Sequence, residues 1–215
     1  MNNLKFLHIP KTGGSSIEYA ARKVGINWGK FDKSLKLDRT YAVGKGPFSK
    51  WHIPQSVEGS DMFCVVRNPW DRIISQFYHK NVIKNYTPVH LNRWIEKTLP
   101  LILSIQKPKH RKKKKTQDNH LLPQIHFVKH STYVLCCERL GADLAQLLDI
   151  YSLPPMTLGR IYGGHIQNKK RKNITFKRLE KNDISPYLRQ ELKNLYQEDS
   201  LIHNLISISD GPYKQ

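Results

Sequence analysis

The chain has 215 residues and a formal net charge of +19. This length suits one domain with an ordinary core, and a hydrophobic content of 39% excludes an intrinsically disordered chain. The positive charge is far larger than solubility requires, so we expect an anionic partner: a nucleotide, a sulfated glycan, nucleic acid or an anionic membrane. A solvated basic surface is the simpler interpretation and stays open.

Three cysteines, Cys64, Cys136 and Cys137, lie in apolar runs that predict buried strands. Neither their number nor their spacing fits a disulfide framework or a cysteine–histidine metal site. No apolar run reaches the roughly 20 residues that a membrane-spanning helix needs, and no signal peptide follows Met1. We therefore expect no integral membrane segment.

The hydrophobic pattern predicts strands that alternate with helices. In chain order we expect a strand at 4–9, a helix at 15–25, short strands at 40–43 and 49–53, a strand at 61–66, a helix at 70–83, one helix or two at 88–104, a strand at 132–137, and helices at 140–150 and 187–206. Ser15 or Ser16 can cap the first helix, and Pro69 lies near the first turn of the second. This alternation argues for an α/β fold with a mostly parallel sheet. We expect a single domain over 1–215, with a mobile basic loop at 105–119.

The turn after the first predicted strand has the composition of a phosphate-binding loop. Its sequence HIPKTGGSS combines glycines, which let backbone N–H groups approach an anion, with the start of a helix and the charge of Lys11. The candidate binding residues are Pro10, Lys11, Thr12, Gly13, Gly14, Ser15 and Ser16. Because the lysine precedes the glycines, the loop is not a Walker A loop of the form GxxxxGK[ST]. An ordinary strand-to-helix turn with a surface lysine is the alternative.

A second motif, VVRNPWDRIISQF, follows the strand at 61–66. Arg67 at the end of that strand and Ser75 on the next helix can converge on one phosphate, with a bidentate guanidinium as the main contact. The alternative is a surface ion-pair cluster of Arg67, Asp71 and Arg72, which would contribute little to stability.

Both motifs resemble those of the carbohydrate sulfotransferases, the Golgi-type enzymes that include heparan and chondroitin sulfotransferases. FLHIPKTGGSSIE is similar to their 5′-phosphosulfate loop, and VVRNPWDRIISQF to their 3′-phosphate motif. The resemblance implies 3′-phosphoadenosine 5′-phosphosulfate (PAPS) as sulfuryl donor, with Arg67 and Ser75 on its 3′-phosphate. It also implies a P-loop-like three-layer fold, in which helices flank a central, mostly parallel sheet.

Weaker similarities extend the resemblance over nearly the whole chain. DNHLLPQ, YVLCCERL and HIQNKKRK are similar to later segments of the family. In the last of these, Arg171 is our candidate for a contact with the 3′-phosphate or the adenine. The missing anchor, the short chain and the absent disulfides depart from the family, so we expect a soluble cytoplasmic protein, or a protein of the Golgi lumen if the chain is a fragment of an anchored enzyme.

The expected reaction is in-line, metal-independent sulfuryl transfer. Positioning and electrostatics supply the catalysis, and Lys11 is placed to neutralise charge on the leaving phosphate. No metal is expected, because a sulfonate carries less charge than a phosphoryl group. A base must accept the proton of the acceptor hydroxyl, and His52 is our first candidate because heparan 2-O-type relatives carry a catalytic histidine in a comparable stretch. Glu18 is second and His120 third, while His8 is expected to be structural.

The acceptor implied by the resemblance and the charge is an anionic or neutral glycan, although a protein tyrosine or a small alcohol stays open. Two other classes of protein compete. A nucleotide kinase of related fold would need a Walker-ordered loop and a carboxylate for Mg²⁺ after the second main strand, where the chain instead reads RNP. A basic nucleic-acid-binding protein would account for the charge, but the sequence carries none of the common nucleic-acid-binding motifs, so nucleic acid is not the expected partner.

Overall fold

The computed structural model describes residues 3–36, 49–80, 86–106, 119–159 and 179–215. At the centre of these residues is a four-stranded sheet in the order β1-β2-β3-β4. The strands are β1 (Leu4–Phe6), β2 (Asp61–Val66), β3 (Tyr133–Cys136) and β4 (Tyr213–Lys214). The first three are parallel, and β4 pairs antiparallel with β3 at the edge. The expected α/β fold with a mostly parallel sheet is confirmed.

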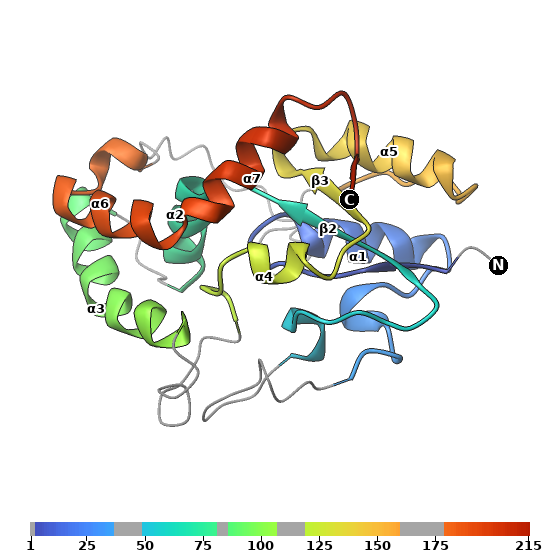
Figure 1. Cartoon of the computed structure of the whole chain (residues 1–215), viewed down its shortest axis with the longest axis horizontal. Helices are drawn as coiled ribbons and strands as arrows, with labels where there is room; N and C mark the ends of the chain where they lie inside the picture. Colours follow the sequence, from blue (N-terminus) through green and yellow to red (C-terminus); the bar gives the residue numbers. More distant parts are fainter. Residues whose placement is uncertain (1–2, 37–48, 81–85, 107–118, 160–178) are drawn as a thin grey trace, which may run out of the picture.

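Helices cover both faces of this sheet (Figure 1). The α-helices are α1 (Gly14–Lys23), α2 (Pro69–Lys80), α3 (Pro88–Gln106), α4 (Ile125–Val128), α5 (Leu140–Ile150), α6 (Pro186–Leu195) and α7 (Gln197–Ser207). Short 3₁₀ helices are η1 (Gly29–Phe31), η2 (Lys50–His52), η4 (Cys137–Arg139) and η5 (Lys181–Asp183).

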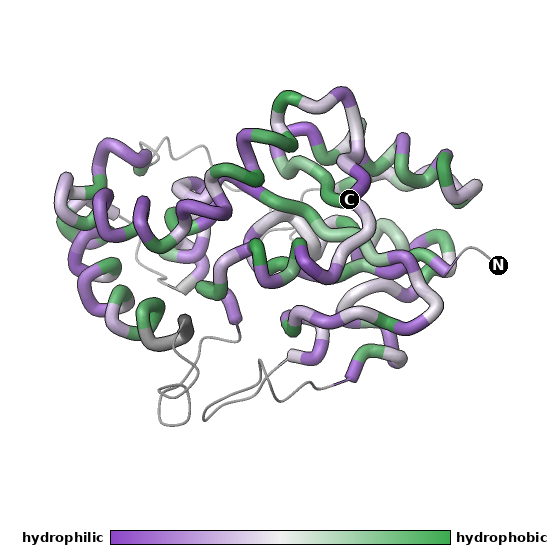
Figure 2. The backbone as a smooth tube through the Cα atoms, viewed as in Figure 1, coloured by the Kyte–Doolittle hydropathy of each residue, from purple (hydrophilic) through white to green (hydrophobic). Residues whose placement is uncertain are grey.

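The side chains of β2 divide the core into two layers, because successive residues of a strand point to opposite faces. Phe63 and Val65 pack with α1 and α5 on one face. Met62, Cys64 and Val66 pack on the other face with α2, α3, α4, α6 and α7. The resulting hydrophobic run through the centre is visible in Figure 2. A strand buried on both faces is typical of a parallel sheet between helix layers.

Several predicted elements differ in detail. β1 ends at Phe6 rather than at residue 9, because the chain leaves the sheet to form the loop before α1. Helix α1 begins at Gly14 with Gly13 as its N-cap, so Ser15 and Ser16 lie in the first turn and cap nothing. The strand predicted at 49–53 is wrong, since η2 occupies this position.

The C-terminal region also differs from the prediction. The helix expected at 187–206 is divided at Tyr196, whose side chain is buried and donates a hydrogen bond to the Leu121 carbonyl oxygen over 2.8 Å. The segment at 88–104 is one helix, α3, which runs through Pro100 to Gln106. Strand β4 was not expected, because two residues carry no readable pattern.

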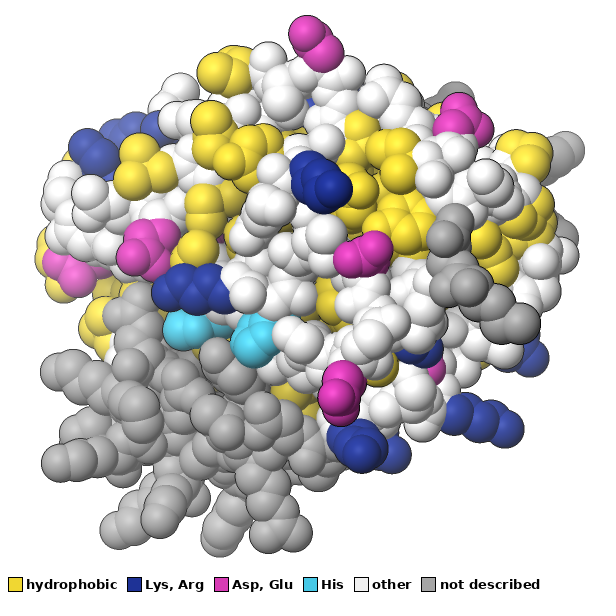
Figure 3. Space-filling view, turned by 45° about the vertical axis from the view of Figure 1, so that its right-hand side comes forward, with side chains coloured by type: hydrophobic (Ala, Val, Ile, Leu, Met, Phe, Trp, Pro, Cys, Tyr) yellow, Lys and Arg dark blue, Asp and Glu magenta, His cyan; other side chains and the backbone are white. Residues whose placement is uncertain are grey.

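Some expectations fall outside the described residues: the short strand at 40–43, most of the basic loop (107–118) and Arg171 with its basic neighbours. In the part of the chain that the structure describes, no helix is long and apolar enough to cross a bilayer. On the face drawn in Figure 3, lysine and arginine side chains lie scattered among acidic ones rather than in one patch.

Candidate active site

The loop between β1 and α1 leads directly into a helix N-terminus. Lys11 and Gly13 adopt left-handed backbone conformations, with φ angles of 73° and 95°, and a non-glycine residue such as Lys11 rarely does so. The Thr12 side chain is buried, and its hydroxyl donates to the Ile9 carbonyl oxygen over 2.9 Å. The first N–H groups of a helix have no acceptor within the helix, so an anion can accept their hydrogen bonds. The local geometry therefore suits an anion-binding loop, which we call the glycine loop (residues 10–16).

Both glycines of this loop disfavour a side chain, Gly13 mainly through its backbone conformation and Gly14 through lack of space. A Cβ atom on Gly13 would lie 3.1 Å from Cδ2 of Leu140, and the positive φ angle already disfavours other residues. A Cβ atom on Gly14 would overlap the imidazole of His8. The two glycines thus let the start of α1 pack closely against the side chains of Leu140 and His8.

Two arginines of the second motif donate hydrogen bonds to backbone carbonyl oxygens of the glycine loop. The Arg67 side chain donates from Nη1 to the Lys11 carbonyl oxygen over 3.2 Å. Arg72 is almost fully buried and donates from Nε to the Pro10 carbonyl oxygen and from Nη2 to that of His120, both over 3.0 Å. The Arg67 side chain therefore contacts the backbone of Lys11. The alternative of a surface cluster that includes Arg72 is wrong, because that guanidinium is internal.

The segment before α4 fixes the backbone of Arg67. The buried amide of Gln124 accepts from the Arg67 N–H over 3.0 Å and donates to the Arg67 carbonyl oxygen over 2.9 Å. Asp199 in turn accepts the backbone N–H groups of Gln124 and Ile125. Burial raises the pKa of Asp199, while burial lowers the pKa of Arg72. These internal groups, which were not selected from the sequence, hold the backbone at the end of β2.

The structure brings together the three histidines His8, His52 and His120. The ring of His52 lies edge-on to that of His8, with centroids 4.8 Å apart, and edge-on to that of His120 at 5.0 Å. His52 is 8% exposed at the end of η2, and its carbonyl oxygen accepts from the Asn119 amide over 2.9 Å. The Nδ1 atom of His120 lies 2.8 Å from Oε1 of Gln76. The first and third candidate bases thus lie side by side, next to the histidine that precedes the glycine loop.

Glu18 is buried beside His8 and is 1% exposed. Its Oε1 lies 2.8 Å from Nδ1 of His8 and accepts the Lys30 backbone N–H over 3.0 Å. Its buried Oε2 has no hydrogen-bond partner among the described residues and lies 3.9 Å from Nζ of Lys30. Burial alone would raise the pKa of Glu18, but the charge and hydrogen bond of His8 and the contacts with Lys30 more than offset it, so this pKa is lowered. Glu18 therefore contacts His8 from the interior.

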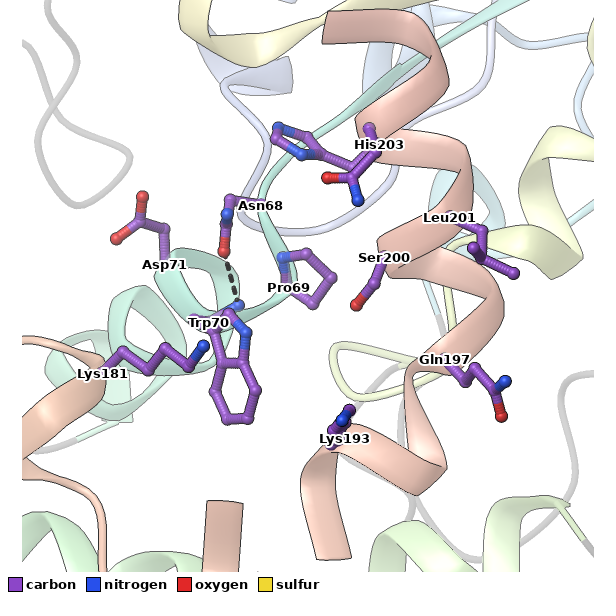
Figure 4. A pocket seen from close by; sticks show the side chains of 11 residues that line it. Asn68, Pro69, Trp70, Asp71, Lys181, Lys193, Gln197, Ser200, Leu201 and His203 are labelled. Atoms are coloured by element: carbon purple, nitrogen blue, oxygen red, sulfur yellow. Dashed lines mark hydrogen bonds between the residues drawn. The ribbon is translucent and has the colours of Figure 1, made fainter. Parts of the chain in front are cut away.

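The other predicted site residues are less closely placed. Ser75 is half-buried on α2, the helix that begins directly after Arg67-Asn68. Ser15 and Ser16 are half-buried in the first turn of α1. A cavity of about 630 Å³ opens beside the start of α2, lined by residues 68–71 of this turn, two lysines and α7 (Figure 4). This cavity was not expected from the sequence, because α7 comes from the far end of the chain.

Comparison with known proteins agrees with the two motifs. The model of the sulfotransferase family matches residues 1–205, nearly the whole chain. No curated protein and no solved structure matches the chain significantly. Since the family match covers both the glycine loop and the second motif, the chain belongs to the sulfotransferase family, whose members are PAPS-dependent enzymes.

Proposed function

We propose that this enzyme transfers a sulfuryl group from PAPS to a hydroxyl group of a carbohydrate, without a metal ion. The observation that carries the proposal is the hydrogen bond from Arg67 Nη1 to the carbonyl oxygen of Lys11, at 3.2 Å. It joins the candidate 5′-phosphosulfate loop to the candidate 3′-phosphate motif, which supports a single site built from both motifs beyond the carboxyl ends of β1 and β2. Ligands of parallel α/β sheets commonly bind at this end.

The residues present fit a sulfated adenine nucleotide. Lys11 and Arg67 supply positive charge, the first turn of α1 supplies backbone N–H groups, and Gly13 and Gly14 keep side chains out of the loop. We assign the 5′-phosphosulfate to Lys11 and the glycine loop, and the 3′-phosphate to Arg67 and Ser75. Arg171 stays a candidate for a contact with the 3′-phosphate or the adenine. When bound, PAPS supplies the sulfuryl group and leaves as adenosine 3′,5′-bisphosphate.

The roles of the protein are to orient the reactants and to compensate charge. The acceptor oxygen forms a bond to sulfur while the bond from sulfur to the phosphate oxygen breaks, and the electron pair of that bond stays on the phosphate. Lys11 stabilises this developing negative charge, which a preorganised cation does effectively in a site that excludes water. A sulfonate carries less charge than a phosphoryl group, so Lys11, Arg67 and the helix N-terminus are sufficient in this proposal.

His52 is the proposed base that accepts the proton of the acceptor hydroxyl. Its position favours it over Glu18, because Glu18 is 1% exposed and contacts His8 rather than the surface. We assign to Glu18 and His8 an indirect role. The carboxylate orients the His8 ring, and that ring packs edge-on against His52 at 4.8 Å. A carboxylate that fixes the orientation of an imidazole is a recurrent device in catalytic sites.

The acceptor class rests on the resemblance to carbohydrate sulfotransferases and on the charge of +19. The direct experiment is transfer of radiolabelled sulfate from PAPS to a panel of neutral, uronic and sulfated glycans, with the linkage of the product mapped. Tyrosine peptides and small alcohols belong in the same panel. If tyrosine peptides or small alcohols became labelled and none of the glycans did, the proposed acceptor class would be wrong. Membership of the sulfotransferase family would not be affected.

Membership of the sulfotransferase family argues against a kinase or a nucleic-acid-binding protein. Calorimetry with adenosine 3′,5′-bisphosphate separates the three classes. A sulfotransferase binds this nucleotide without Mg²⁺, whereas a kinase would prefer ATP with Mg²⁺ and a nucleic-acid-binding protein would bind neither tightly. Tighter binding of ATP with Mg²⁺ would contradict the proposed use of the glycine loop.

A further inference from the structure

We propose that Cys136, Glu138 and His203 form a binding site for a transition-metal ion of the Zn²⁺ class, separate from the glycine loop. Cys136 ends β3, Glu138 follows it in η4, and His203 comes from α7. Oε2 of Glu138 lies 3.1 Å from Sγ of Cys136 and 3.2 Å from Nε2 of His203. The three ligand atoms all lie within 4.8 Å of one another. We call these residues the Cys136 cluster.

Two of these separations, those from Glu138, are close to the ligand separations of a tetrahedral metal centre, whereas Sγ of Cys136 and Nε2 of His203, which lie within 4.8 Å, would move closer together on binding. Zinc binds sulfur at about 2.3 Å and nitrogen or oxygen at about 2.0–2.2 Å, so neighbouring ligand atoms of a tetrahedron lie roughly 3.4–3.6 Å apart. The pairs that involve Glu138 need to open only by a few tenths of an ångström. One thiolate, one imidazole and one carboxylate form a donor set that suits Zn²⁺ and Co²⁺ and leaves a fourth position for water.

A metal ion at the Cys136 cluster would take the place of a proton. A cysteine thiol is mostly protonated at neutral pH, and the thiolate is the form that binds a metal ion. The neighbouring Arg139 is paired with Asp143 through a 2.7 Å hydrogen bond, which offsets its charge. Binding would replace the thiol proton by the metal ion and release that proton to solvent.

The cavity beside α2 gives the cluster access to solvent. His203 and Asn68 both line this cavity, and the side chain of Glu138 is 43% exposed (Figure 4). The fourth ligand position would be filled from this side. Oε1 of Glu138 also accepts the backbone N–H of Asn68 over 3.1 Å, next to Arg67. A bound ion would therefore link β3 and α7 to the turn that carries Arg67, and we assign it a stabilising role outside the sulfuryl-transfer chemistry.

The test uses the full chain after dialysis against a chelator. Titration with Co²⁺ should give one equivalent of binding and a thiolate-to-cobalt charge-transfer absorption, and Zn²⁺ should displace the cobalt. Cys136→Ser should remove this absorption and weaken Zn²⁺ binding by more than the roughly 10–100-fold that loss of an outer-shell partner costs. The matched control is Cys137→Ser, because this neighbouring half-buried thiol lies outside the cluster. His203→Gln and Glu138→Gln should weaken binding as Cys136→Ser does.

A second measurement needs no variant. Calorimetry of Zn²⁺ binding in two buffers of different ionisation enthalpy should report the release of about one proton near neutral pH, as expected for a thiol that becomes a thiolate. Binding without proton release would overturn the proposal. So would the absence of stoichiometric binding, or a Co²⁺ absorption that Cys136→Ser leaves unchanged. Either of the last two results would mean that the three side chains only form a hydrogen-bonded network between β3 and α7.

Discussion

The two polar clusters at the carboxyl end of the sheet differ in how the sequence encodes them. The glycine loop is one continuous stretch that follows β1 and includes the first turn of α1, and its partner Arg67 directly follows the adjacent strand β2. The Cys136 cluster combines the end of β3 with a histidine of α7, and only the tertiary structure brings these together. A continuous motif at a strand end can be recognised from the sequence, whereas a site assembled from distant elements cannot. The two clusters also have different proposed roles: the glycine loop takes part in turnover, and the Cys136 cluster binds a metal ion.

The largest effect on turnover is expected from His52→Asn. Loss of a general base typically lowers the rate roughly 100- to 10,000-fold, so kcat for sulfuryl transfer should fall within this range. The metal affinity of the Cys136 cluster should not change, because His52 lies on η2, beside His8 and His120. His90→Asn, at an exposed position on α3, is the matched control and should keep full activity. Retention of wild-type kcat by the His52 variant would eliminate this histidine as the base.

Lys11→Ala should lower kcat by roughly 100- to 1,000-fold, because a preorganised charge at the leaving group is lost. Steady-state assays with PAPS measure this, and circular dichroism should show an intact fold. Lys23→Ala, at the exposed end of the same helix, is the control. Cobalt absorption of the Lys11 variant should equal that of the wild type, and its loss would mean that the two clusters are not independent.

Arg67→Ala should act mainly on nucleotide affinity. A charge-assisted hydrogen bond contributes about 1.5–3 kcal/mol, and calorimetry with adenosine 3′,5′-bisphosphate measures this loss directly. Because Arg67 also donates to the Lys11 carbonyl oxygen, a smaller decrease in kcat is expected as well. Arg93→Ala, on the exposed side of α3, should bind the nucleotide normally. Unchanged affinity in the Arg67 variant would remove this arginine from the proposed 3′-phosphate site.

The elements that the sequence predicts well are those with a strong local pattern. The hydrophobic run DMFCVV became β2 at the predicted residues, and LGADLAQLLDI became α5. The two sequence motifs follow strands β1 and β2, which the structure shows to be adjacent and parallel, and the Arg67 side chain contacts the Lys11 backbone. In these cases, the local sequence and the tertiary structure favour the same conformation.

The predictions that failed depend on tertiary contacts. The sequence around Tyr196 is compatible with an uninterrupted helix, but the buried hydrogen bond from Tyr196 to Leu121 accompanies the break between α6 and α7. That break precedes Asp199, which caps the segment that holds Arg67. Likewise, Arg72 looks like a surface residue in the sequence, but in the fold its guanidinium is buried and donates to the carbonyl oxygens of Pro10 and His120. Such contacts join residues far apart in the chain and leave no local pattern.

The smallest expected effect concerns Glu18, whose contacts are internal. Its folded-state pKa is lowered below the ordinary 4.5 by His8 and Lys30, so its carboxylate stabilises the fold above about that pH, and this contribution is lost as the pH falls through the lowered value. Glu18→Gln should therefore decrease the free energy of unfolding by about 1–3 kcal/mol near neutral pH, and the difference from the wild type should shrink in acid. Urea unfolding across this pH range measures both.

A control variant completes the stability test, and the Glu18 variant also tests the indirect catalytic role proposed for Glu18. Glu96→Gln, on the exposed surface of α3, should follow the wild-type stability at every pH. If Glu18 orients His8 and thereby His52, its variant should also shift the pH profile of kcat, which a purely structural carboxylate would leave in place. A destabilised variant with an unchanged profile would limit Glu18 to holding α1 against η1. The contact between Glu18 and His8 would then have no effect on His52, the proposed base.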